Sequence, residues 1–407
     1  MKNINQCENN VYYYISNQKL FIKMSDDNIR IVDTRPSYYY NGWLDPKTNS
    51  NGHIPNSVNF SYKWIGKNKS NSELIKEFER ISLEKHNEIV LYGEKSKIVY
   101  DCLIRLGYKN VKILKEGLNS WLKLSTNLDK LVGYKALIYP KWLNSLIKGD
   151  NVETMKNSIY KLFEVSWGEG DDYKAGHIKG AVHIDTEEFE ERPLWNRKSD
   201  KDIEKALIKN GIRLDSTVLL YGLDTRAVSR VAIILKYAGV KDVRILDGGF
   251  KLWVAEGYEI ERKINSKIST LNFANKTRIN SNYIIDKNEL QRRMKYKKTK
   301  VLSIRSLEEY NKQTSGYSYI FKKGRIEGDT FGYDTDFYRN VDDTMFNYEL
   351  IKKNWLNKNI SKDDNLVFYC GTGWRASEIV FYSELMGWEN SSLYDGGWLE
   401  WSEEMCN

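Results

Sequence analysis

Apolar runs of five to seven residues alternate with stretches of helical periodicity along this chain, and each run predicts a buried strand. Three of the runs end in tyrosine, at Glu88–Tyr92, Thr217–Tyr221 and Asn365–Tyr369. Three others precede them, at Ile29–Arg35, Leu162–Ser166 and Lys300–Arg305. Because parallel strands need crossover connections, usually helices that cover both faces of the sheet, the alternation predicts an α/β fold with parallel sheets.

A closing segment follows each tyrosine-ending run, so the whole pattern occurs three times along the chain. A glycine and a tryptophan lie fourteen positions apart in each copy, as Gly107 and Trp121, Gly239 and Trp253, and Gly387 and Trp401. The sequence Asp-Gly-Gly recurs at 247–249 and 395–397, and a Gly-His-Ile or Gly-Arg-Ile turn begins at 52, 176 and 324. Such repetition indicates three tandem domains, which we place at residues 1–129, 130–271 and 272–407 and call the first, second and third repeats.

The third repeat carries a cysteine directly after its tyrosine-ending run. The sequence there is Cys-Gly-Thr-Gly-Trp-Arg at 370–375, and helical periodicity follows from Ala376 to Met386. Its two glycines permit backbone angles that side chains forbid, so we expect successive N–H groups to converge on the Cys370 sulfur above the helix N-terminus. These dipoles and the guanidinium of Arg375 favour the thiolate. The stretch therefore predicts a primed nucleophile that needs no base beside it.

Length, cysteine spacing and charge argue against several other classes of protein. A chain of 407 residues fits two or three domains, and no run of about 18 apolar residues suggests a membrane span. The four cysteines, at 7, 102, 370 and 406, lack CxxC and metal-ligand spacing, which argues against a zinc site and a disulfide framework. The net charge of +8 is spread along the chain. Its densest basic run, at 291–300, indicates a solvated helix end rather than a nucleic-acid surface.

The chain ends carry weaker signals. The first ten residues lack the apolar core of a signal peptide, so we expect a cytoplasmic protein, although a chain with its export signal removed would show the same start.

Two of the other cysteines have no expected role in chemistry. Cys102 is expected to be a small buried residue on a helix. Cys406 could resolve a persulfide as a disulfide, but an idle terminal thiol is favoured. Asp286 and Glu289 predict a capping box at the start of the third repeat.

At the Cys370 loop the chain resembles the rhodanese family of sulfurtransferases. Four residues separate Cys370 from Arg375, whereas cysteine phosphatases and arsenate reductases of similar plan have five, so the ring suits one extra sulfur atom rather than a phosphate. Together with Tyr394–Trp398 and Trp401, the loop is most similar to the last domain of three-domain bacterial thiosulfate sulfurtransferases. The segment 314–324 also has a counterpart there. The resemblance implies three tandem rhodanese-like domains, each a parallel sheet with helices on both faces.

The resemblance also implies a reaction. Cys370 is expected to attack the outer sulfur of thiosulfate, so that sulfite departs and a persulfide remains, with no cofactor. Cyanide or a thiol, such as that of thioredoxin, would then remove the sulfur in a ping-pong cycle. Arg375 would stabilise negative charge in both half-reactions. The residues expected to hold the substrate are Gly371, Thr372, Gly373 and Trp374.

Arg305 is the one predicted substrate contact outside the loop. It stands at the end of its apolar run, whose carboxyl edge faces the same crevice as the loop in a parallel sheet, so it could meet the sulfonate of the donor. A structural ion pair is an equally open interpretation. Ser303 stands where the family often has aspartate, and Arg325 replaces the histidine of the other repeats. These two departures concern the substrate contacts and leave the loop intact.

The first two repeats lack the nucleophile. Gly222 occupies the position of Cys370 in the second repeat, followed by Asp224, whose negative charge is unsuited to an anion. The loop of the first repeat is three residues shorter and carries Glu94. All four histidines, at 53, 86, 177 and 183, lie in these repeats, so a Cys–His pair within the third is excluded. We expect both repeats to be structural, with binding of a protein partner or sulfur acceptor as the alternative.

Three further functions stay open at this point. A 3-mercaptopyruvate donor is the nearest, and the three-domain resemblance favours thiosulfate over it. A non-catalytic sulfur carrier or binding scaffold would form no turnover product. A cysteine phosphatase would hydrolyse aryl phosphates, which the four-residue spacing disfavours.

Overall fold

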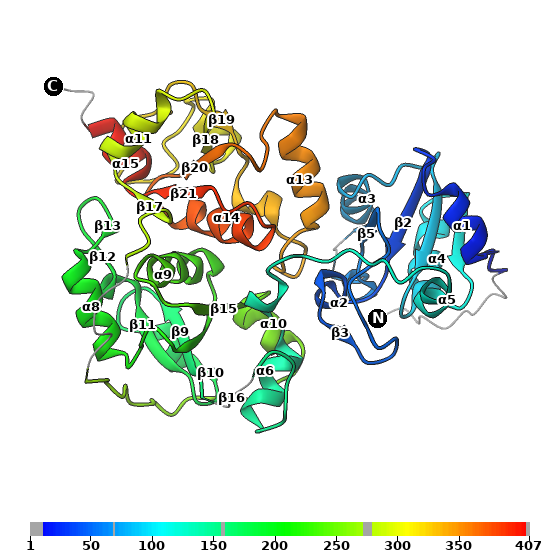
Figure 1. The fold of residues 1–407 in the computed structure, drawn as a ribbon, viewed down its shortest axis with the longest axis horizontal. Coiled ribbons are helices and arrows are strands. Elements are labelled where there is room, and N and C mark those ends of the chain that lie inside the picture. Colours follow the sequence, from blue (N-terminus) through cyan, green and yellow to red (C-terminus); the bar gives the residue numbers. More distant parts are fainter. Residues whose placement is uncertain (1–10, 68–69, 156–158, 272–278, 404–407) are drawn as a thin grey trace. The chain divides into compact units, whose positions relative to one another are not determined.

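The structure is a computed structural model that describes residues 11–67, 70–155, 159–271 and 279–403 (Figure 1). Within this described part the chain forms two compact units. One unit comprises the residues up to Tyr134 together with Asn347–Lys352, and the other comprises Lys135–Phe346 and the residues from Lys353 onward. The second and third repeats thus share a unit, apart from residues 130–134 and Asn347–Lys352. The boundaries at 129 and 271 stay predictions.

Each repeat forms a five-stranded parallel sheet, and the strand order is the same in all three. In the first repeat the order is β1-β7-β6-β2-β5, with β1 Tyr14–Ile15, β2 Ile29–Asp33, β5 Ser57–Asn59, β6 Glu88–Tyr92 and β7 Val111–Leu114. In the second it is β8-β15-β14-β9-β11, with β8 Leu137–Ile138, β9 Lys161–Ser166, β11 Val182–Asp185, β14 Thr217–Tyr221 and β15 Asp242–Leu246. In the third it is β17-β21-β20-β18-β19, with β17 Ile284–Ile285, β18 Thr299–Ser303, β19 Thr330–Phe331, β20 Asn365–Tyr369 and β21 Ser391–Tyr394. The predicted α/β fold of three tandem parallel sheets is confirmed.

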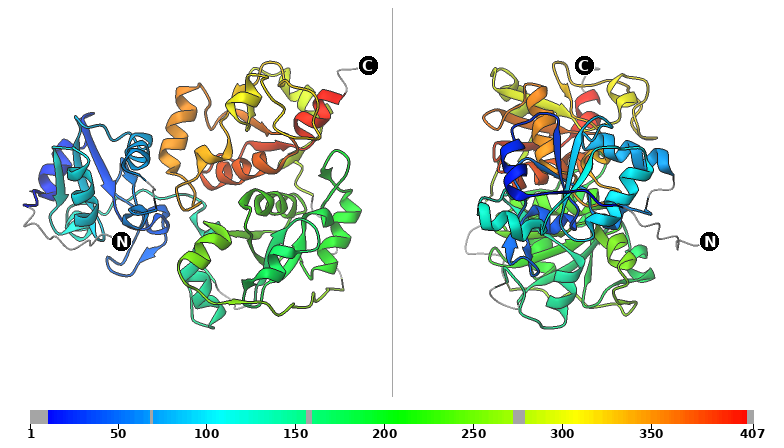
Figure 2. Two further views of the ribbon diagram at one scale, coloured as in Figure 1. Left: turned by 180° about the vertical axis from the view of Figure 1, so that it is seen from behind. Right: turned by 90° about the vertical axis from the view of Figure 1, so that its right-hand side faces the viewer.

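Helices lie on both faces of each sheet (Figures 1 and 2). Those of the first repeat are α1 Asn17–Lys23, α2 Ser37–Asn41, α3 Asn71–Arg80, α4 Ser96–Arg105 and α5 Gly117–Leu124. Those of the second are α6 Pro140–Ile147, α7 Asp171–Ala175, α8 Asp200–Lys209, α9 Thr225–Tyr237 and α10 Gly249–Ala255. Those of the third are α11 Lys287–Met294, α12 Leu307–Tyr310, α13 Tyr348–Asn357, α14 Trp374–Leu385 and α15 Gly397–Glu403. Short antiparallel pairs join β3 Leu44–Asp45 to β4 Ser50–Asn51, β10 His177–Ile178 to β16 Ile260–Glu261, and β12 Glu190–Glu191 to β13 Asn196–Arg197.

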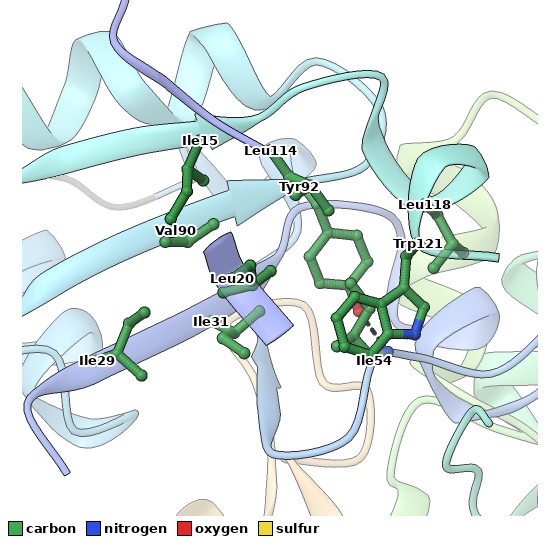
Figure 3. Packing of buried hydrophobic residues seen from close by; sticks show 10 residues of the cluster. All are labelled: Ile15, Leu20, Ile29, Ile31, Ile54, Val90, Tyr92, Leu114, Leu118 and Trp121. Atoms are coloured by element: carbon green, nitrogen blue, oxygen red, sulfur yellow. Dashed lines mark hydrogen bonds between the residues drawn. The ribbon is translucent and has the colours of Figure 1, made fainter. Parts of the chain in front are cut away.

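The tyrosine that ends the central strand of each repeat has a common structural role. In the first repeat the hydroxyl of Tyr92 accepts a hydrogen bond from the N–H of Ile54 at 3.0 Å, within an apolar cluster that includes Leu20 and Trp121 (Figure 3). The same bond joins the later tyrosines and isoleucines, at 2.8 Å between Tyr221 and Ile178 and at 3.2 Å between Tyr369 and Ile326. Because a buried hydroxyl needs a partner, this bond explains why the tyrosine and the Gly-X-Ile turn recur together.

Two details of the third repeat differ from the sequence-based expectation. The strand β18 ends at Ser303, so Arg305 lies beyond the strand rather than at its end. Asp286 caps α11 by accepting from the Glu289 N–H at 2.8 Å, as predicted, but Glu289 pairs with Arg292 and Arg293. The predicted capping box is therefore only half formed, because two arginines compete for the Glu289 carboxylate.

Within the second unit, α9 of the second repeat packs along α14 of the third (Figures 1 and 2). Both helices are buried along nearly their whole length. Each begins just after the loop that follows the tyrosine-ending strand of its repeat. Packing of the two helices therefore brings the Gly222 loop and the Cys370 loop together at the interface between the second and third repeats, which we call the seam.

Candidate active site

In the Cys370 loop one amide turns toward the sulfur, where the glycine pattern predicts several successive N–H groups. Gly373 has a φ of 101°, in the left-handed region that favours glycine, and its N–H donates to Cys370 Sγ at 3.1 Å. Cys370 itself is fully buried. The sulfur thus lies at the N-terminal end of α14, where an amide hydrogen bond and the helix dipole favour negative charge.

The Asp-Gly-Gly segment of the repeat binds the other side of this loop. The N–H groups at the start of α15, from Trp398 and Leu399, donate to the carbonyl oxygens of Cys370 and Gly371 at 2.8 and 3.1 Å. A side chain at Gly397 would bring its Cβ within 2.5 Å of the Gly371 oxygen, so only glycine allows this close approach. The N–H groups of α15 therefore bind two carbonyl oxygens of the loop. Without these hydrogen bonds, the negative ends of the two carbonyl dipoles would disfavour an anion on the sulfur.

Arg375 is held by carboxylates rather than left to face solvent. Its two terminal nitrogens donate to the Glu309 oxygens at 2.7 and 2.9 Å, and further bonds of 3.1 Å reach Asp334 and the hydroxyl of Tyr317. Burial acts to raise the pKa of Glu309, but the hydrogen bonds and charge of Arg375 outweigh it and hold that pKa below its usual value. Glu309 fixes the guanidinium beside the loop, as a bidentate pair does.

Arg305 has its hydrogen-bond partners outside the Cys370 loop, and its contact with the donor stays a prediction. It is fully buried and donates to Glu309 at 3.1 Å, to the carbonyl of Gly324 at 2.6 Å and to the carbonyl of Ser315 at 3.2 Å. It also lies over the ring of Trp398. This placement matches the structural ion-pair interpretation, because the chain leaves β18 two residues before Arg305 and turns its side chain into the domain.

A pocket of about 520 Å³ lies beside the loop. The third repeat lines it with Tyr317, Tyr319, Thr372, Trp374 and Arg375. The second repeat lines it with Trp167, Arg192, Trp195, Asp224 and Arg226. Of the predicted substrate-binding residues, Thr372 and Trp374 thus face the pocket. The walls combine five aromatic rings with one acidic and three basic side chains.

Tyrosines 317 and 319 cover the loop on the pocket side. A Cβ on Gly371 would lie 2.1 Å from the ring of Tyr317, so that ring rests directly on the glycine. Burial raises the pKa of Tyr317 above its ordinary value, which keeps its hydroxyl protonated. Burial also raises the pKa of Tyr319, against the opposing effect of a hydrogen bond with Thr372. Both rings line the pocket, whereas Cys370 is not among its lining residues.

The Gly222 loop forms the facing wall. Asp224 caps α9 and forms a bidentate pair with Arg226, with both distances 2.8 Å. Burial works to raise the pKa of Asp224, but the bonds and charge of Arg226 hold it below its usual value. The Asp224 carboxylate, whose negative charge was expected to repel an anion, therefore has a cationic partner in Arg226. The Gly222 loop carries no nucleophile, but it forms one wall of the pocket.

A buried ion network joins the two repeats directly behind the Cys370 loop. Arg230 of α9 lies 3.1 Å from Glu190 and 2.7 Å from Asp395. Glu190 in turn accepts from the indole N–H of Trp374 at 2.8 Å. Burial raises the pKa of Glu190, against the lowering effect of Arg230. The network ties the first helical residue of α14 to the second repeat.

Sequence reasoning missed several of these residues. Glu309 had a local signal, because Ser306 and Glu309 form a capping box at the start of α12 that the sequence pattern contains. Tyr317 and Tyr319 lie in the aromatic segment 314–324, whose signal in the sequence is its part in the resemblance. Glu190 and Arg230 had no local signal, since their partners come from another repeat.

Fold and loop together define the class of protein, and comparison with known families agrees. The model of the rhodanese-like domain matches residues 17–124, 140–256 and 286–404. The chain belongs to the rhodanese-like domain family. Each matched segment lies inside one predicted repeat.

Similar proteins of known structure span nearly the whole chain. The thiosulfate sulfurtransferase YnjE of Escherichia coli K12 is 37% identical over 394 residues, which cover 95% of this chain and 89% of YnjE. A crystal structure of YnjE superposes with a TM-score of 0.91 at 36% identity, covering 98% of this chain and 96% of the other. The anaerobic ergothioneine biosynthesis enzyme from Chlorobium limicola, solved with its natural substrate trimethyl histidine, superposes with a TM-score of 0.91 at 30% identity and covers 98% of both chains. An EanB variant solved with ergothioneine linked to a persulfide cysteine has a TM-score of 0.92 at 31% identity, covering 97% of both chains.

The described residues lack two kinds of feature. None of their helices combines the length and apolar character that crossing a bilayer requires. Among the same residues, no cluster of three or more histidine, cysteine, aspartate or glutamate side chains is placed to hold a metal ion.

Proposed function

We propose that the protein transfers the outer sulfur of thiosulfate to a thiol or cyanide through a persulfide on Cys370. The observation that carries the proposal is the geometry of the loop, in which Gly373 donates to Sγ while α15 binds the loop carbonyls. The similarity to a thiosulfate sulfurtransferase over 95% of the chain supports the choice of donor.

The proposed reaction has two steps. The Cys370 thiolate forms a bond to the outer sulfur of thiosulfate, the S–S bond of the donor breaks, and sulfite leaves with the electron pair. The acceptor then attacks the outer sulfur of the persulfide, and the Cys370 thiolate leaves. Arg375, held beside the loop by Glu309, stabilises negative charge on sulfur in both steps.

Access to the sulfur runs past Tyr317 in this proposal. The pocket reaches Thr372, Trp374 and Arg375, whereas Cys370 is buried beneath them. Tyr317 rests on Gly371 and hydrogen-bonds Arg375, so its ring must move for the donor to meet Sγ. The first repeat is assigned no chemistry.

Intact-mass measurement after exposure to thiosulfate tests the proposal. We expect the wild type to gain the mass of one sulfur atom and Cys370→Ser to gain none. Cys102→Ser is the matched control, because Cys102 is also a buried free cysteine, and it should gain sulfur like the wild type. Equal adducts on the wild type and Cys370→Ser would overturn the assignment. The same assay with 3-mercaptopyruvate identifies the donor, and a persulfide that no acceptor discharges would indicate a carrier rather than an enzyme.

A second candidate function has an organic acceptor in place of cyanide or a simple thiol. The pocket of about 520 Å³ is larger than thiosulfate requires, and its five aromatic rings suit a flat or cationic organic molecule. Two structures with TM-scores of 0.91 and 0.92 contain trimethyl histidine and ergothioneine, respectively. Incubation of the persulfide form with trimethyl histidine distinguishes the candidates, since ergothioneine and loss of the added sulfur mass are expected only for the second.

A further inference from the structure

The Cys370 loop and the Gly222 loop occupy equivalent positions in their repeats, and a charged residue on each following helix also corresponds. Arg230 stands eight positions after Gly222, and Glu378 stands eight positions after Cys370. The helices that carry them, α9 and α14, pack against each other. Each charged residue therefore lies in the seam next to the loop of the other repeat, and the two charges have opposite signs.

Arg230 lies directly behind the loop that carries sulfur. A Cβ on Gly373 would lie 3.1 Å from its terminal nitrogen, and Gly373 is the residue whose N–H donates to Cys370 Sγ. Arg230 is fully buried and also donates to the carbonyl of Trp195 at 3.0 Å. Its ion pair with Asp395 fixes the residue that precedes the two glycines of the α15 turn. The guanidinium thus contacts the loop from behind and holds the turn that binds the loop carbonyls.

Glu378 has the matching position on the loop without a nucleophile. It accepts from the hydroxyl of Thr225 at 3.4 Å, and Thr225 is the counterpart of Gly373. Its partner in its own repeat is Arg339. Asp247, the counterpart of Asp395, has the acidic side chain of Glu378 nearby instead of an arginine. Across the seam, the Cys370 loop therefore has an arginine with two carboxylate partners, and the Gly222 loop has a glutamate paired with an arginine.

We propose that Arg230 of the second repeat is a positioning residue for sulfur transfer in the third. It acts through two links: one to Asp395 and the α15 turn, and one through Glu190 to the indole of Trp374. The first link reaches the loop through the N–H groups of α15, and the second ends on Trp374 of the loop, so together they keep the Gly373 N–H aimed at Sγ. The proposal rests on the proposed function, and it makes the second repeat part of the sulfur-transfer machinery rather than a spacer.

Kinetics of three variants test the proposal on the full-length chain. Arg230→Met removes the charge, Arg230→Lys keeps it, and Glu378→Gln alters the equivalent place behind the empty loop. Because Arg230 does not line the pocket, we expect Arg230→Met to lower kcat for sulfur transfer from thiosulfate by about 10- to 100-fold with little change in KM, the size typical of a misplaced reacting group. Arg230→Lys should recover part of the loss, and Glu378→Gln should stay near the wild type.

Stability is measured alongside, so that loss of folding is not taken for loss of positioning. Thermal unfolding identifies the fraction of each variant that is folded, and kcat is expressed per folded molecule; if Arg230→Met does not fold, Arg230→Lys carries the comparison. A wild-type kcat in both Arg230 variants would overturn the proposal. So would an equal loss in Glu378→Gln, because that would show a general effect of the seam. A wild type that takes up no sulfur would instead reject the proposed function.

Discussion

Replacement of Asp247 by asparagine is expected to raise the free energy of unfolding relative to the wild type, by an amount that grows as the pH rises. Asp247 accepts a hydrogen bond from the Met345 N–H at 2.8 Å across the seam between the second and third repeats. Burial, reinforced by the charges of Asp342 and Glu378, raises the pKa of the Asp247 carboxyl to about 8. In the unfolded chain this carboxyl titrates near its ordinary pKa of about 4. Between these values the folded state keeps a proton that the unfolded state has lost, so stability falls as pH rises from about 4 to about 8.

The pKa gives the size of the effect. A rise of about four pKa units at about 1.4 kcal/mol per unit corresponds to about 5 kcal/mol across the whole window. Asparagine keeps the Oδ1 acceptor for Met345 and carries no charge. The free energy of unfolding of Asp247→Asn, taken relative to the wild type, should therefore rise by up to about 5 kcal/mol between about pH 4 and pH 8.

Urea denaturation of both proteins at several pH values within this window measures the difference. Asp395→Asn is the matched control, because Asp395 occupies the equivalent position but pairs with Arg230. Its replacement leaves a buried guanidinium without one of its carboxylates, so that variant should be less stable than the wild type throughout. A difference between Asp247→Asn and the wild type that stays constant or shrinks as pH rises would refute the assigned electrostatics of the seam.

Two further predictions concern the loop itself. Glu309→Gln deprives the buried Arg305 and Arg375 of their shared carboxylate. We therefore expect urea denaturation to show a fall in the free energy of unfolding of about 3 to 5 kcal/mol, and we expect sulfur uptake to be lost. Unchanged stability would contradict the importance of these two ion pairs. Gly397→Ala places a Cβ within 2.5 Å of a loop carbonyl and should abolish sulfur uptake per folded molecule, measured by intact mass. Gly249→Ala makes the equivalent change at the empty loop and should only destabilise, so equal loss of uptake in both variants would count against the role given to α15.

The sequence predicted those features that depend on neighbouring residues. The central strands match because an apolar run ending in tyrosine is a local signal, and β6, β14 and β20 have the expected bounds. The turn of the Gly373 amide toward Cys370 also follows locally, from a glycine in a left-handed conformation. Residues that contact each other within one loop or turn were therefore within reach of sequence reasoning.

Features that depend on contacts between distant segments were not predicted. Arg305 was placed by its position after an apolar run, but β18 ends at Ser303 and the side chain turns inward to Glu309 and two carbonyls. The second repeat was expected to be structural, because its loop lacks cysteine. Its contribution to the pocket and to the network behind the loop arises from the packing of α9 on α14, which no local pattern encodes.

The most direct test of the central claim follows each sulfur of the donor separately. Thiosulfate labelled at its outer sulfur and thiosulfate labelled at its inner sulfur are incubated with the wild type, and the peptide that contains Cys370 is isolated under non-reducing conditions. We predict that the outer label stays on this peptide and is released by cyanide, while the inner label leaves as sulfite. Retention of the inner label, or outer label on any other peptide, would contradict sulfur transfer through a Cys370 persulfide.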